Sequence, residues 1–509
     1  FTLAKKSAQA LRQRYGNKHN NKSHACILFT SGSTSMPKGV PLTNYNLLED
    51  VRGVIDRAKF TGKDIIMAAL PPFHSFGFVA TTVVPLLYGI RCVYYPNPTA
   101  FFDIGRKMAR WQPTVYFSTP TWMLKVYAAT NRMAQWTSSL RVVVVGAEAC
   151  PLKLLKVAKK RGGATVLEGY GITETSPVIA TGVLGRQNLG VGWPINGVDV
   201  RLVLFDDYYS MRNKDVEEED EKILKQLKHK MAIELELQSL VKNGKGKSKE
   251  ASMLRCRLNR PMVSKEVKAG EKNDKGEPLL GAIIVSGPNV FGNPDGESYL
   301  NRQVDQANDD GEYKFDPYIE YDGKVWYNTE DLGRYSTPED FENLKKKLAE
   351  KDEDDDDGEV VEDHQPHYED KEDRGPAIII AGRIKRFIKR GGEMVSLGAI
   401  EQSLFSVFPE VEGKRVVAVE SVTVKSPDGG TEPFLAALVC CASVDNEKKA
   451  WNLVKKAINA SFSSAANLHM PDRIFIVDEV PMLGTGKLDL QKCKKVISDL
   501  LTNLRASKG

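Results

Sequence analysis

Residues 25–39 read ACILFTSGSTSMPKG, and the interpretation of the whole chain starts from this stretch. An apolar run is followed by hydroxyl side chains, two glycines and Lys38. Small residues allow backbone N–H groups to point into one concavity, and hydroxyls and a lysine add donors for phosphate oxygens. On its own the stretch leaves two interpretations open: a phosphate-binding loop, or a polar turn between a strand and a helix.

Short β-rich runs alternate with helix-like segments from residue 26 to residue 203. The runs are ACILF, DIIMAAL, IRCVYY, PTVYFS, LRVVVVG and ATVLEG. This alternation is typical of an α/β protein whose strands are largely parallel. After residue 383 a strand–helix–strand pattern indicates a smaller α+β domain. We therefore expect a large α/β domain over 1–382 and a small C-terminal domain over 383–509.

Two low-complexity segments interrupt this pattern and are expected to be insertions. The first, at about 208–276, begins with a charged, helix-periodic stretch and then becomes rich in lysine and glycine, which predicts a solvent-exposed helix and a loop. The second, at about 337–375, contains 14 acidic residues and two lysines between 350 and 373, a net charge of −12. We expect this acidic insertion to be disordered, because it has too little apolar surface to bury.

The composition sets limits on the class of protein. With 509 residues, 41% of them hydrophobic and 27% charged, the chain is typical of globular proteins with more than one domain. No apolar run reaches the roughly 20 residues of a transmembrane helix. Seven cysteines without a C-x-x-C pair argue against a disulfide framework and against zinc, and favour the cytoplasm or another reducing compartment.

Five further motifs follow the first stretch along the chain. They are LPPFHSFG at 70–77, LEGYGITETSP at 167–177, YNTEDLGRY at 327–335, GRIKRFIKRGGEMVSL at 382–397 and PMLGTGKLD at 481–489. Each motif alone could be an ordinary turn. The basic RIKRFIKR cluster could in isolation bind nucleic acid, but no stacking aromatics alternate with its charges, so we expect no nucleic-acid partner.

Together and in this order, the motifs resemble those of the adenylate-forming (acyl-activating, AMP-binding) enzyme superfamily. The resemblance covers nearly the whole chain outside the two insertions, and is strongest to acyl–acyl carrier protein synthetases, including the synthetase half of the bacterial bifunctional 2-acylglycerophosphoethanolamine acyltransferase. It implies a large AMP-binding domain and a small, mobile C-terminal lid domain. It also implies that ATP with Mg²⁺ activates a fatty acid to an acyl-adenylate, which then passes to a phosphopantetheine thiol. Only 29 residues precede the loop, so we expect part of the large domain to be missing and the chain to be a fragment or the C-terminal product of a longer protein.

The resemblance also assigns roles to individual residues. The β- and γ-phosphates would be cradled by Thr30, Ser31, Gly32, Ser33, Thr34, Lys38 and Gly39. The rest of the nucleotide would meet Gly146, Ala147, Glu148, Tyr170, Gly171, Asp331 and Arg383. Thr173 would contact the α-phosphate, Glu174 would hold Mg²⁺, and His74 would line the junction of acyl group and thiol. Lys487 would be the main adenylation catalyst, Lys385 the hinge, and Gly391 and Gly392 part of the thiol tunnel.

Several alternatives remain open at this point. The acceptor thiol would belong to acyl carrier protein, or to CoA in a long-chain acyl-CoA synthetase. A protein of another class, an inactive member that acts as a binding or membrane-surface module, is the second alternative, and peripheral membrane association fits a lipid substrate. Ser35 and Glu330 stand where the family usually has glycine.

Overall fold

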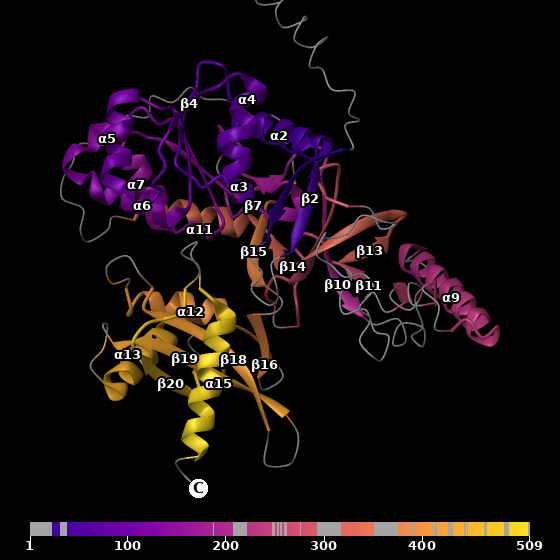
Figure 1. Ribbon diagram of the computed structural model, residues 1–509. Helices are drawn as coiled ribbons and strands as arrows, with labels where there is room; N and C mark the ends of the chain where they lie inside the picture. Colours follow the sequence, from indigo (N-terminus) through magenta and orange to yellow (C-terminus); the bar gives the residue numbers. More distant parts are fainter. Residues whose placement is uncertain are drawn as a thin grey trace, which may run out of the picture. The chain divides into compact units, whose positions relative to one another are not determined.

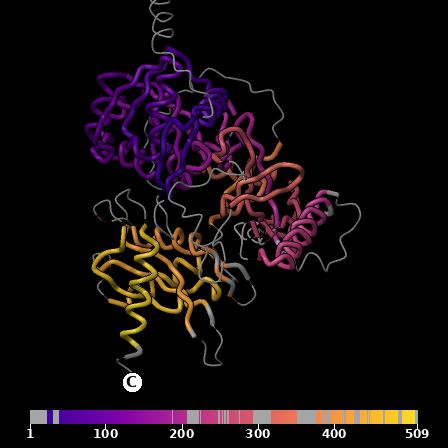
Figure 2. Tube along the Cα trace, turned by 45° about the vertical axis from the view of Figure 1, so that its right-hand side comes forward, coloured from indigo at the N-terminus to yellow at the C-terminus, as the bar shows by residue number. Residues whose placement is uncertain are grey.

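The computed structural model describes most of the chain (Figures 1 and 2). The described residues are 23–30, 38–186, 188–206, 221–246, 250–251, 254, 257–258, 262–274, 276–292, 317–350, 375–383, 386–390, 393–409, 411, 415–425, 431–441, 444, 446–462, 466–482 and 488–506. They form two compact units. The first unit extends to Ile380, and the second runs from Ala381 onward and includes Glu330–Leu332.

The centre of the first unit is a seven-stranded sheet with the order β4-β3-β5-β6-β7-β8-β9. Its strands are β3 (Ile65–Ala68), β4 (Arg91–Tyr94), β5 (Val115–Ser118), β6 (Val142–Gly146), β7 (Thr165–Gly171), β8 (Val178–Thr181) and β9 (Trp193–Pro194). The five strands β3 to β7 pair in parallel, whereas β8 and β9 are antiparallel. The predicted α/β class and the largely parallel strands are confirmed.

Helices cover this sheet, and alternate residues of its strands pack on opposite faces. The helices are α2 (Asn44–Ala58), α3 (Ser75–Phe78), η1 (Val79–Val83), α4 (Val84–Tyr88), α5 (Phe101–Trp111), α6 (Pro120–Ala129), η2 (Asn131–Thr137) and α7 (Leu152–Lys160). Val142 and Val144 of β6 share a core with α2, while Val143 and Val145 share a second core with α5, α6 and α7. This alternation explains why the sequence shows the strand as one continuous apolar run.

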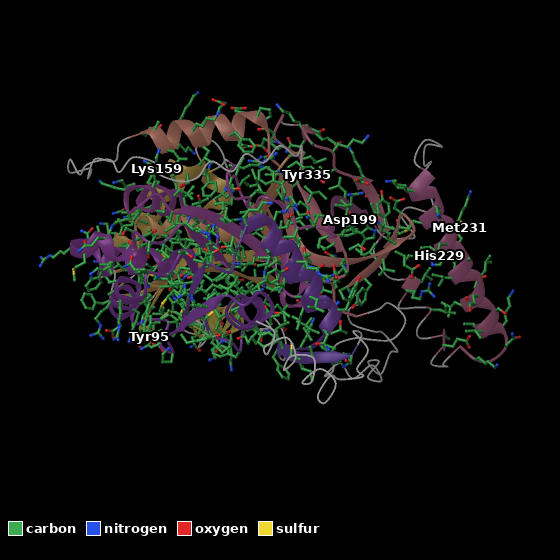
Figure 3. All side chains as sticks on the ribbon, turned by 90° about the horizontal axis from the view of Figure 1, so that it is seen from above. Tyr95, Lys159, Asp199, His229, Met231 and Tyr335 are labelled. Atoms are coloured by element: carbon green, nitrogen blue, oxygen red, sulfur yellow. The ribbon has the colours of Figure 1, made fainter. Side chains whose placement is uncertain are left out.

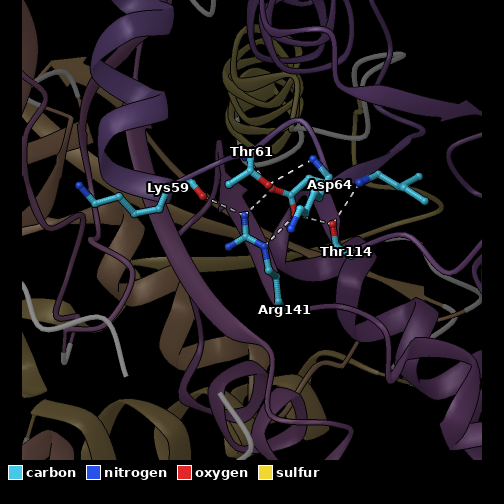
Figure 4. Close-up of polar contacts among 7 residues, drawn as sticks. Lys59, Thr61, Asp64, Thr114 and Arg141 are labelled. Atoms are coloured by element: carbon cyan, nitrogen blue, oxygen red, sulfur yellow. Dashed lines mark hydrogen bonds and ion pairs between the residues drawn. The ribbon is translucent and has the colours of Figure 1, made fainter. Parts of the chain in front are cut away.

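An ion pair fixes the amino ends of the central strands (Figure 4). The Arg141 guanidinium donates to both carboxylate oxygens of Asp64, at 2.8 and 2.7 Å, and Thr114 donates to Asp64 Oδ1 at 2.6 Å. Burial acts to raise the pKa of Asp64, but these hydrogen bonds outweigh burial and leave the pKa below its usual value. Because the three residues lie at or next to the starts of β3, β5 and β6, they hold these strands in register at the end opposite to the sequence motifs.

A second sheet in the chain has the order β11-β10-β12-β14-β13, with β15 also paired to β14. Its strands are β10 (Asp199–Asp206), β11 (Met262–Glu266), β12 (Gly281–Ser286), β13 (Tyr318–Tyr321), β14 (Lys324–Tyr335) and β15 (Ile378–Arg383). A separate hairpin joins β1 (His24–Phe29) to β2 (Gly39–Thr43).

The first insertion is more closely packed than the sequence predicts. Its helix α9 (Glu221–Lys242) buries the side chains of Gln226 and Lys230, which hydrogen-bond to Glu320 O at 2.9 Å and to Leu258 O at 2.9 Å. On the same helix His229 pairs with the Glu320 carboxylate at 2.6 Å, whereas Met231 is 44% exposed (Figure 3). The expectation of a solvent-exposed helix is therefore wrong for one face, because Ile223 and Ile233 join a buried apolar cluster and the polar side chains bond to backbone carbonyls. The insertion also supplies β11, the edge strand of the second sheet.

The second insertion begins with a helix, which corrects the expectation of disorder over its first part. Helix α11 (Pro338–Ala349) starts at Thr337, whose hydroxyl accepts from the Asp340 backbone N–H while the Asp340 carboxylate accepts from the backbone N–H of Thr337. Arg334 donates to both oxygens of Asp340 at 2.7 Å. This capping box, with proline at the first helical position, explains why the helix begins there. Residues 351–374, the main part of the acidic run, lie outside the described residues.

The second unit has a three-stranded sheet and helices around one apolar core. Its elements are β16 (Phe387–Arg390), β17 (Glu393–Ser396), α12 (Leu397–Phe405), β18 (Val417–Lys425), β19 (Thr431–Cys440), α13 (Glu447–Phe462), α14 (Ala466–His469), β20 (Arg473–Val477) and α15 (Leu490–Ala506). Strand β19 pairs antiparallel with β18 and parallel with β20. The predicted α+β pattern of this region is confirmed. Across the part of the chain that the structure describes, no helix has the length and apolarity needed to cross a membrane.

Candidate functional site

The ends of the first loop are held together by a hairpin rather than by a strand and a helix. Thr30 N donates to Lys38 O at 3.0 Å, and Lys38 N donates to Thr30 Oγ1 at 3.3 Å. Gly39 follows as the first residue of β2, paired with Phe29. Strand β2 thus separates the loop from α2, which rules out a direct strand-to-helix turn. Ser31, Gly32, Ser33, Thr34 and Ser35 lie outside the described residues.

Two of the other motifs and the Gly146–Glu148 segment meet at the carboxyl ends of the parallel strands. Strand β3 pairs with β4 on one side and with β5 on the other, so the strand order reverses at β3. In open α/β sheets, ligands bind outside the carboxyl ends of the strands at such a reversal. The segment 70–77 follows β3, the segment 146–148 follows β6, and the segment 170–174 ends β7. The topology therefore brings together motifs separated by up to a hundred residues in sequence.

His74 is fixed in place by the turn that follows β3. Its Nδ1 accepts a hydrogen bond from Phe76 N at 3.3 Å and caps helix α3. The next residue, Ser75, is buried, and its Oγ lies 3.5 Å from Oγ1 of Thr173. This contact joins the His74 turn to the turn after β7.

The segment Gly146–Glu148 is supported by two carboxylates. Glu148 Oε2 accepts from Thr121 Oγ1 at 2.6 Å, and Glu168 Oε1 on β7 accepts from Cys150 N at 3.0 Å. In the same segment Ala147 adopts a left-handed φ of +69°. Burial raises the pKa of Glu168 to about 7, with the Cys150 hydrogen bond opposing this shift. Burial, with the neighbouring Glu168 carboxylate, raises the pKa of the Cys150 thiol to about 12, which disfavours the thiolate form.

The turn after β7 carries Tyr170, Gly171, Thr173 and Glu174. Thr173 and Glu174 lie in η3 (Thr173–Thr175), and Glu174 is 9% exposed. A Cβ added to Gly171 would lie 1.8 Å from Pro177 O, so a residue with a side chain would force the turn to open. Phe291 N donates to Glu174 O at 2.8 Å and holds the turn against the segment after β12. The side chain of Glu174 is thus presented by a rigid backbone.

Asp331 and Arg383 are brought together by neighbouring strands. The Arg383 Nε lies 3.6 Å from Asp331 Oδ1, with Asp331 buried on β14 and Arg383 exposed on β15. Glu330 has a φ of +61°, the left-handed conformation in which glycine is favoured. Lys385, Gly391, Gly392 and Lys487 lie outside the described residues, so their assignments stay predictions.

Sequence reasoning missed several residues that support the site. Ser75 contacts Thr173 and Thr121 contacts Glu148, whereas Glu168 accepts from Cys150 N, just after the Gly146–Glu148 segment. Ser75 and Glu168 were both inside quoted motifs. A carboxylate in a β-rich run is itself a signal, because a charged group in a buried strand needs a reason to be there.

The donor set fits a nucleotide with magnesium. Hydroxyls, a lysine and backbone N–H groups suit phosphate oxygens, and Mg²⁺ is commonly held by one or two carboxylates together with substrate phosphates. Glu174 provides one such carboxylate. No group of three or more His, Cys, Asp or Glu side chains able to hold a metal occurs among the described residues, so a metal cage made wholly of protein side chains is absent there.

Parts of the chain are similar to known proteins. A model of the AMP-binding enzyme family matches residues 2–214. The mitochondrial malonate–CoA ligase ACSF3 of Homo sapiens is 31% identical over 194 residues, which are 35% of this chain and 34% of that protein. The match therefore spans about a third of this relative's length. A CoA ligase of Gibberella moniliformis is 23% identical over 517 residues, covering 94% of this chain and 69% of the relative.

A solved structure shows the same fold over a longer range. The crystal structure of ATP-bound MatB from Rhodopseudomonas palustris aligns with 95% of this chain and 70% of its own, with a TM-score of 0.59 and 19% identity. Residues 2–214 thus match the AMP-binding enzyme family, and the fold over 95% of the chain is similar to that of ATP-bound MatB.

Proposed function

We propose that this protein is an AMP-forming acid–thiol ligase that activates a fatty acid with ATP and transfers the acyl group to a phosphopantetheine thiol. In the first step a carboxylate oxygen bonds to the α-phosphorus, the bond to the β-phosphate oxygen breaks and pyrophosphate leaves. In the second step the thiol sulfur bonds to the acyl carbon, the bond to the AMP oxygen breaks, and AMP and a proton are released. The observation that carries this proposal is the contact of Ser75 with Thr173, which joins two motif turns at the carboxyl edge of the sheet.

The first step brings two anions together, so the protein's contribution is positioning and charge stabilisation. In our proposal Thr30 and Lys38 flank the loop that holds the β- and γ-phosphates, and Thr173 donates to the α-phosphate. Tyr170 lies against the adenine, with the Gly146–Glu148 segment on the other side of the base. Glu174 holds Mg²⁺, which would neutralise phosphate charge when bound.

The remaining roles concern the C-terminal domain. Asp331 and Arg383 hold the ribose hydroxyls, and Arg383 begins the domain that we assign to residues 383–509. Lys487 serves adenylation as a point charge. Rotation of this domain about Lys385 would withdraw Lys487 from the active site and bring in the Gly391–Gly392 loop, through which the thiol enters. His74 lines the junction of acyl group and thiol.

For the acceptor, the names of the relatives favour CoA, whereas the motif at 382–397 favours acyl carrier protein. Pyrophosphate exchange with a fatty acid tests the first step. Parallel reactions with CoA and with holo-acyl carrier protein then identify the acceptor. An absence of exchange across short, medium and long acids would favour the alternative of an inactive binding module. We also propose that the protein works in a reducing compartment and associates peripherally with a membrane.

Lys487→Ala tests the assigned catalyst. We expect adenylate formation to fall by roughly 10²-fold or more, as for the loss of a single electrostatic donor. Thioester formation from supplied acyl-adenylate should fall much less, because Lys487 has no role in the second step. Lys495→Ala, an exposed lysine of α15, is the matched control. Equal losses in both half-reactions of Lys487→Ala would contradict the assignment.

A further inference from the structure

A buried polar cluster lies behind the turn that carries Thr173 and Glu174. It joins Asp50 of α2 to Thr175 and Ser176 of the turn and to Asn289, which follows β12. All four residues are fully buried, with relative exposures of 0%. Polar groups so far from water are expected to be hydrogen-bonded, so each donor and acceptor in the cluster should have a partner.

Asn289 ties the turn to strand β8. Its Nδ2 donates to Thr175 O at 2.9 Å and to Val178 O at 2.7 Å, and lies 3.4 Å from Asp50 Oδ1. Its backbone carbonyl accepts from Ser176 Oγ at 2.8 Å. The two amide hydrogens of Asn289 are therefore committed to the two carbonyls, which are the closer acceptors.

The acceptors of the cluster are not matched in the same way. Asp50 Oδ1 accepts from Val178 N at 2.9 Å. Among the described residues, neither Asp50 Oδ2 nor Asn289 Oδ1 has a hydrogen-bond partner. If Asp50 were ionised, the cluster would contain two buried acceptors without a donor and a buried negative charge. Each of these is costly in a protein interior.

Within the part of the chain that the structure describes, no cation is paired with Asp50 to relieve this charge. The groups that hydrogen-bond to Asp50 from other elements, Val178 and Asn289, are neutral. The buried cation of the same helix, Arg57, is seven residues on, about 10 Å along the axis, and donates to Pro194 O. Glu174 on the turn is an acid. Burial raises the pKa of Asp50 well above its usual value, and only the two hydrogen bonds oppose this.

We propose that Asp50 is a positioning residue whose Oδ2 carries a proton and donates to Asn289, so that a neutral pair clamps the Thr173–Ser176 turn for nucleotide binding. One proton satisfies both unpartnered oxygens and removes the charge. The identity of the ligand rests on the function proposed above, whereas the protonated clamp itself does not.

Three variants separate the clamp from general packing. Asp50→Asn mimics the neutral acid, since its amide can still donate to Asn289, and Asp50→Leu removes every hydrogen bond. Asp56→Asn is the matched control on the same helix, where the carboxylate is 41% exposed and pairs with Lys59. Hydrogen exchange is measured by mass spectrometry on the purified full chain without substrate.

We expect exchange in peptides covering 172–179 to become about tenfold faster in Asp50→Leu, as for the loss of a buried hydrogen bond. Asp50→Asn should lose no protection relative to the wild type, and Asp56→Asn should stay within about twofold of it. Equal loss of protection in Asp50→Asn and Asp50→Leu would overturn the proposal.

A pH series tests the proton directly and does not require that Asp50→Leu folds. In the wild type, folding must return a proton to Asp50, which is ionised in the unfolded chain above pH 4. The protection-factor ratio of Asp50→Asn to wild type in β5 and β6 should therefore rise with pH above pH 4, by about tenfold per pH unit until the pH reaches the pKa of Asp50 in the folded protein. The same ratio for Asp56→Asn should be flat. A flat ratio for Asp50→Asn would show that Asp50 is ionised in the folded protein.

The link to catalysis has its own readout. In pyrophosphate exchange, Asp50→Leu should raise KM for Mg-ATP about tenfold, corresponding to the loss of a buried hydrogen bond, and Asp50→Asn should not. If the wild type shows no pyrophosphate exchange, the proposed function fails. The two hydrogen-exchange experiments still show whether the clamp exists. If pyrophosphate exchange by Asp50→Leu has a normal KM for Mg-ATP, the clamp does not position the turn for nucleotide binding.

Discussion

Glu330 has a backbone conformation that conflicts with its side chain. Its φ of +61° costs a residue with a Cβ about 1–2 kcal/mol. The sequence indicated Glu330 as unusual, because the family that the motifs resemble usually has glycine at this position. The structure gives the physical reason, since only glycine enters this region freely.

Glu330→Gly should therefore stabilise the folded protein. The relief of strain is partly offset by the larger backbone entropy of glycine in the unfolded chain, about 0.4–1 kcal/mol, so the net gain is about 0.5–1 kcal/mol. Calorimetric unfolding measures it. Glu330→Ala keeps the Cβ and should not reproduce the gain; an equal gain in both variants would show that charge, not backbone strain, is relieved.

At the same scale, the sequence predicted the residues at the carboxyl edge but not those that hold them. His74, Thr173 and Glu174 stand in recognisable motifs. Asp50 and Asn289 do not, because their contacts join segments more than a hundred residues apart and depend on tertiary packing. Local patterns contain no signal for such contacts, and the charge state of Asp50 follows only from burial.

Among the elements of the second unit, strand β16 is anchored by a buried ion-pair cluster. Arg386, just before β16, donates to both carboxylate oxygens of Glu401 on α12, at 3.1 and 3.2 Å, and to Val419 O at 2.7 Å. Its Nε lies 3.5 Å from Glu420 Oε1, and Lys494 of α15 lies 3.6 Å from the other oxygen. Four elements are thus tied together directly after the segment that we assign as the hinge.

Arg386→Met should destabilise this unit by about 3–5 kcal/mol, because it leaves Glu401 and Glu420 buried with less compensation. Urea unfolding of the full chain, followed by hydrogen exchange in β18 and β19, measures the loss. Lys495→Met on α15 is the matched control and should change stability by less than about 0.5 kcal/mol. In the double variant Arg386→Met with Glu401→Gln, part of the loss should be recovered, since one uncompensated charge is removed. Strict additivity would mean that the pair is not coupled.

The elements were predicted correctly where apolar periodicity determines the structure. They were missed where contacts of polar residues contribute to it. Strands β3 to β7 follow from continuous apolar runs. Helix α11 was missed because its start depends on the Thr337–Asp340 capping box within an acidic composition. The buried face of α9 was missed because Ile223 and Ile233 share it with Gln226 and Lys230, polar residues that usually lie at the surface.

At the scale of the whole molecule, charge is divided very unevenly. The net charge is +5, and residues 350–373 contribute −12, so the rest of the chain stands at +17. The helix that leads into this acidic run, α11, packs on α7, and Lys156 of α7 donates to Glu350 O at 2.9 Å. Neither helix belongs to the candidate site.

Replacing residues 352–373 by a short Gly/Ser linker should therefore leave kcat/KM within about twofold at 0.15 M salt, where distant charges are largely screened. Pyrophosphate exchange and thioester formation measure it. A variant of full length, with the acids of this run changed to their amides, is the matched control for charge. A collapse of turnover in either variant would show that the acidic run takes part in catalysis.

Both ends of the acidic run are attached to the same unit, and this has a practical consequence. Its amino end follows α11, and at its carboxyl end the Trp193 indole donates to Gly375 O at 2.9 Å, within the same unit. With both ends fixed to one body, doubling the contour length of the connection costs only about 0.6 kcal/mol of closure entropy. Evolution can thus lengthen or recode this connection at little thermodynamic cost, and an experimenter can place an epitope or a fluorophore there without disturbing either sheet.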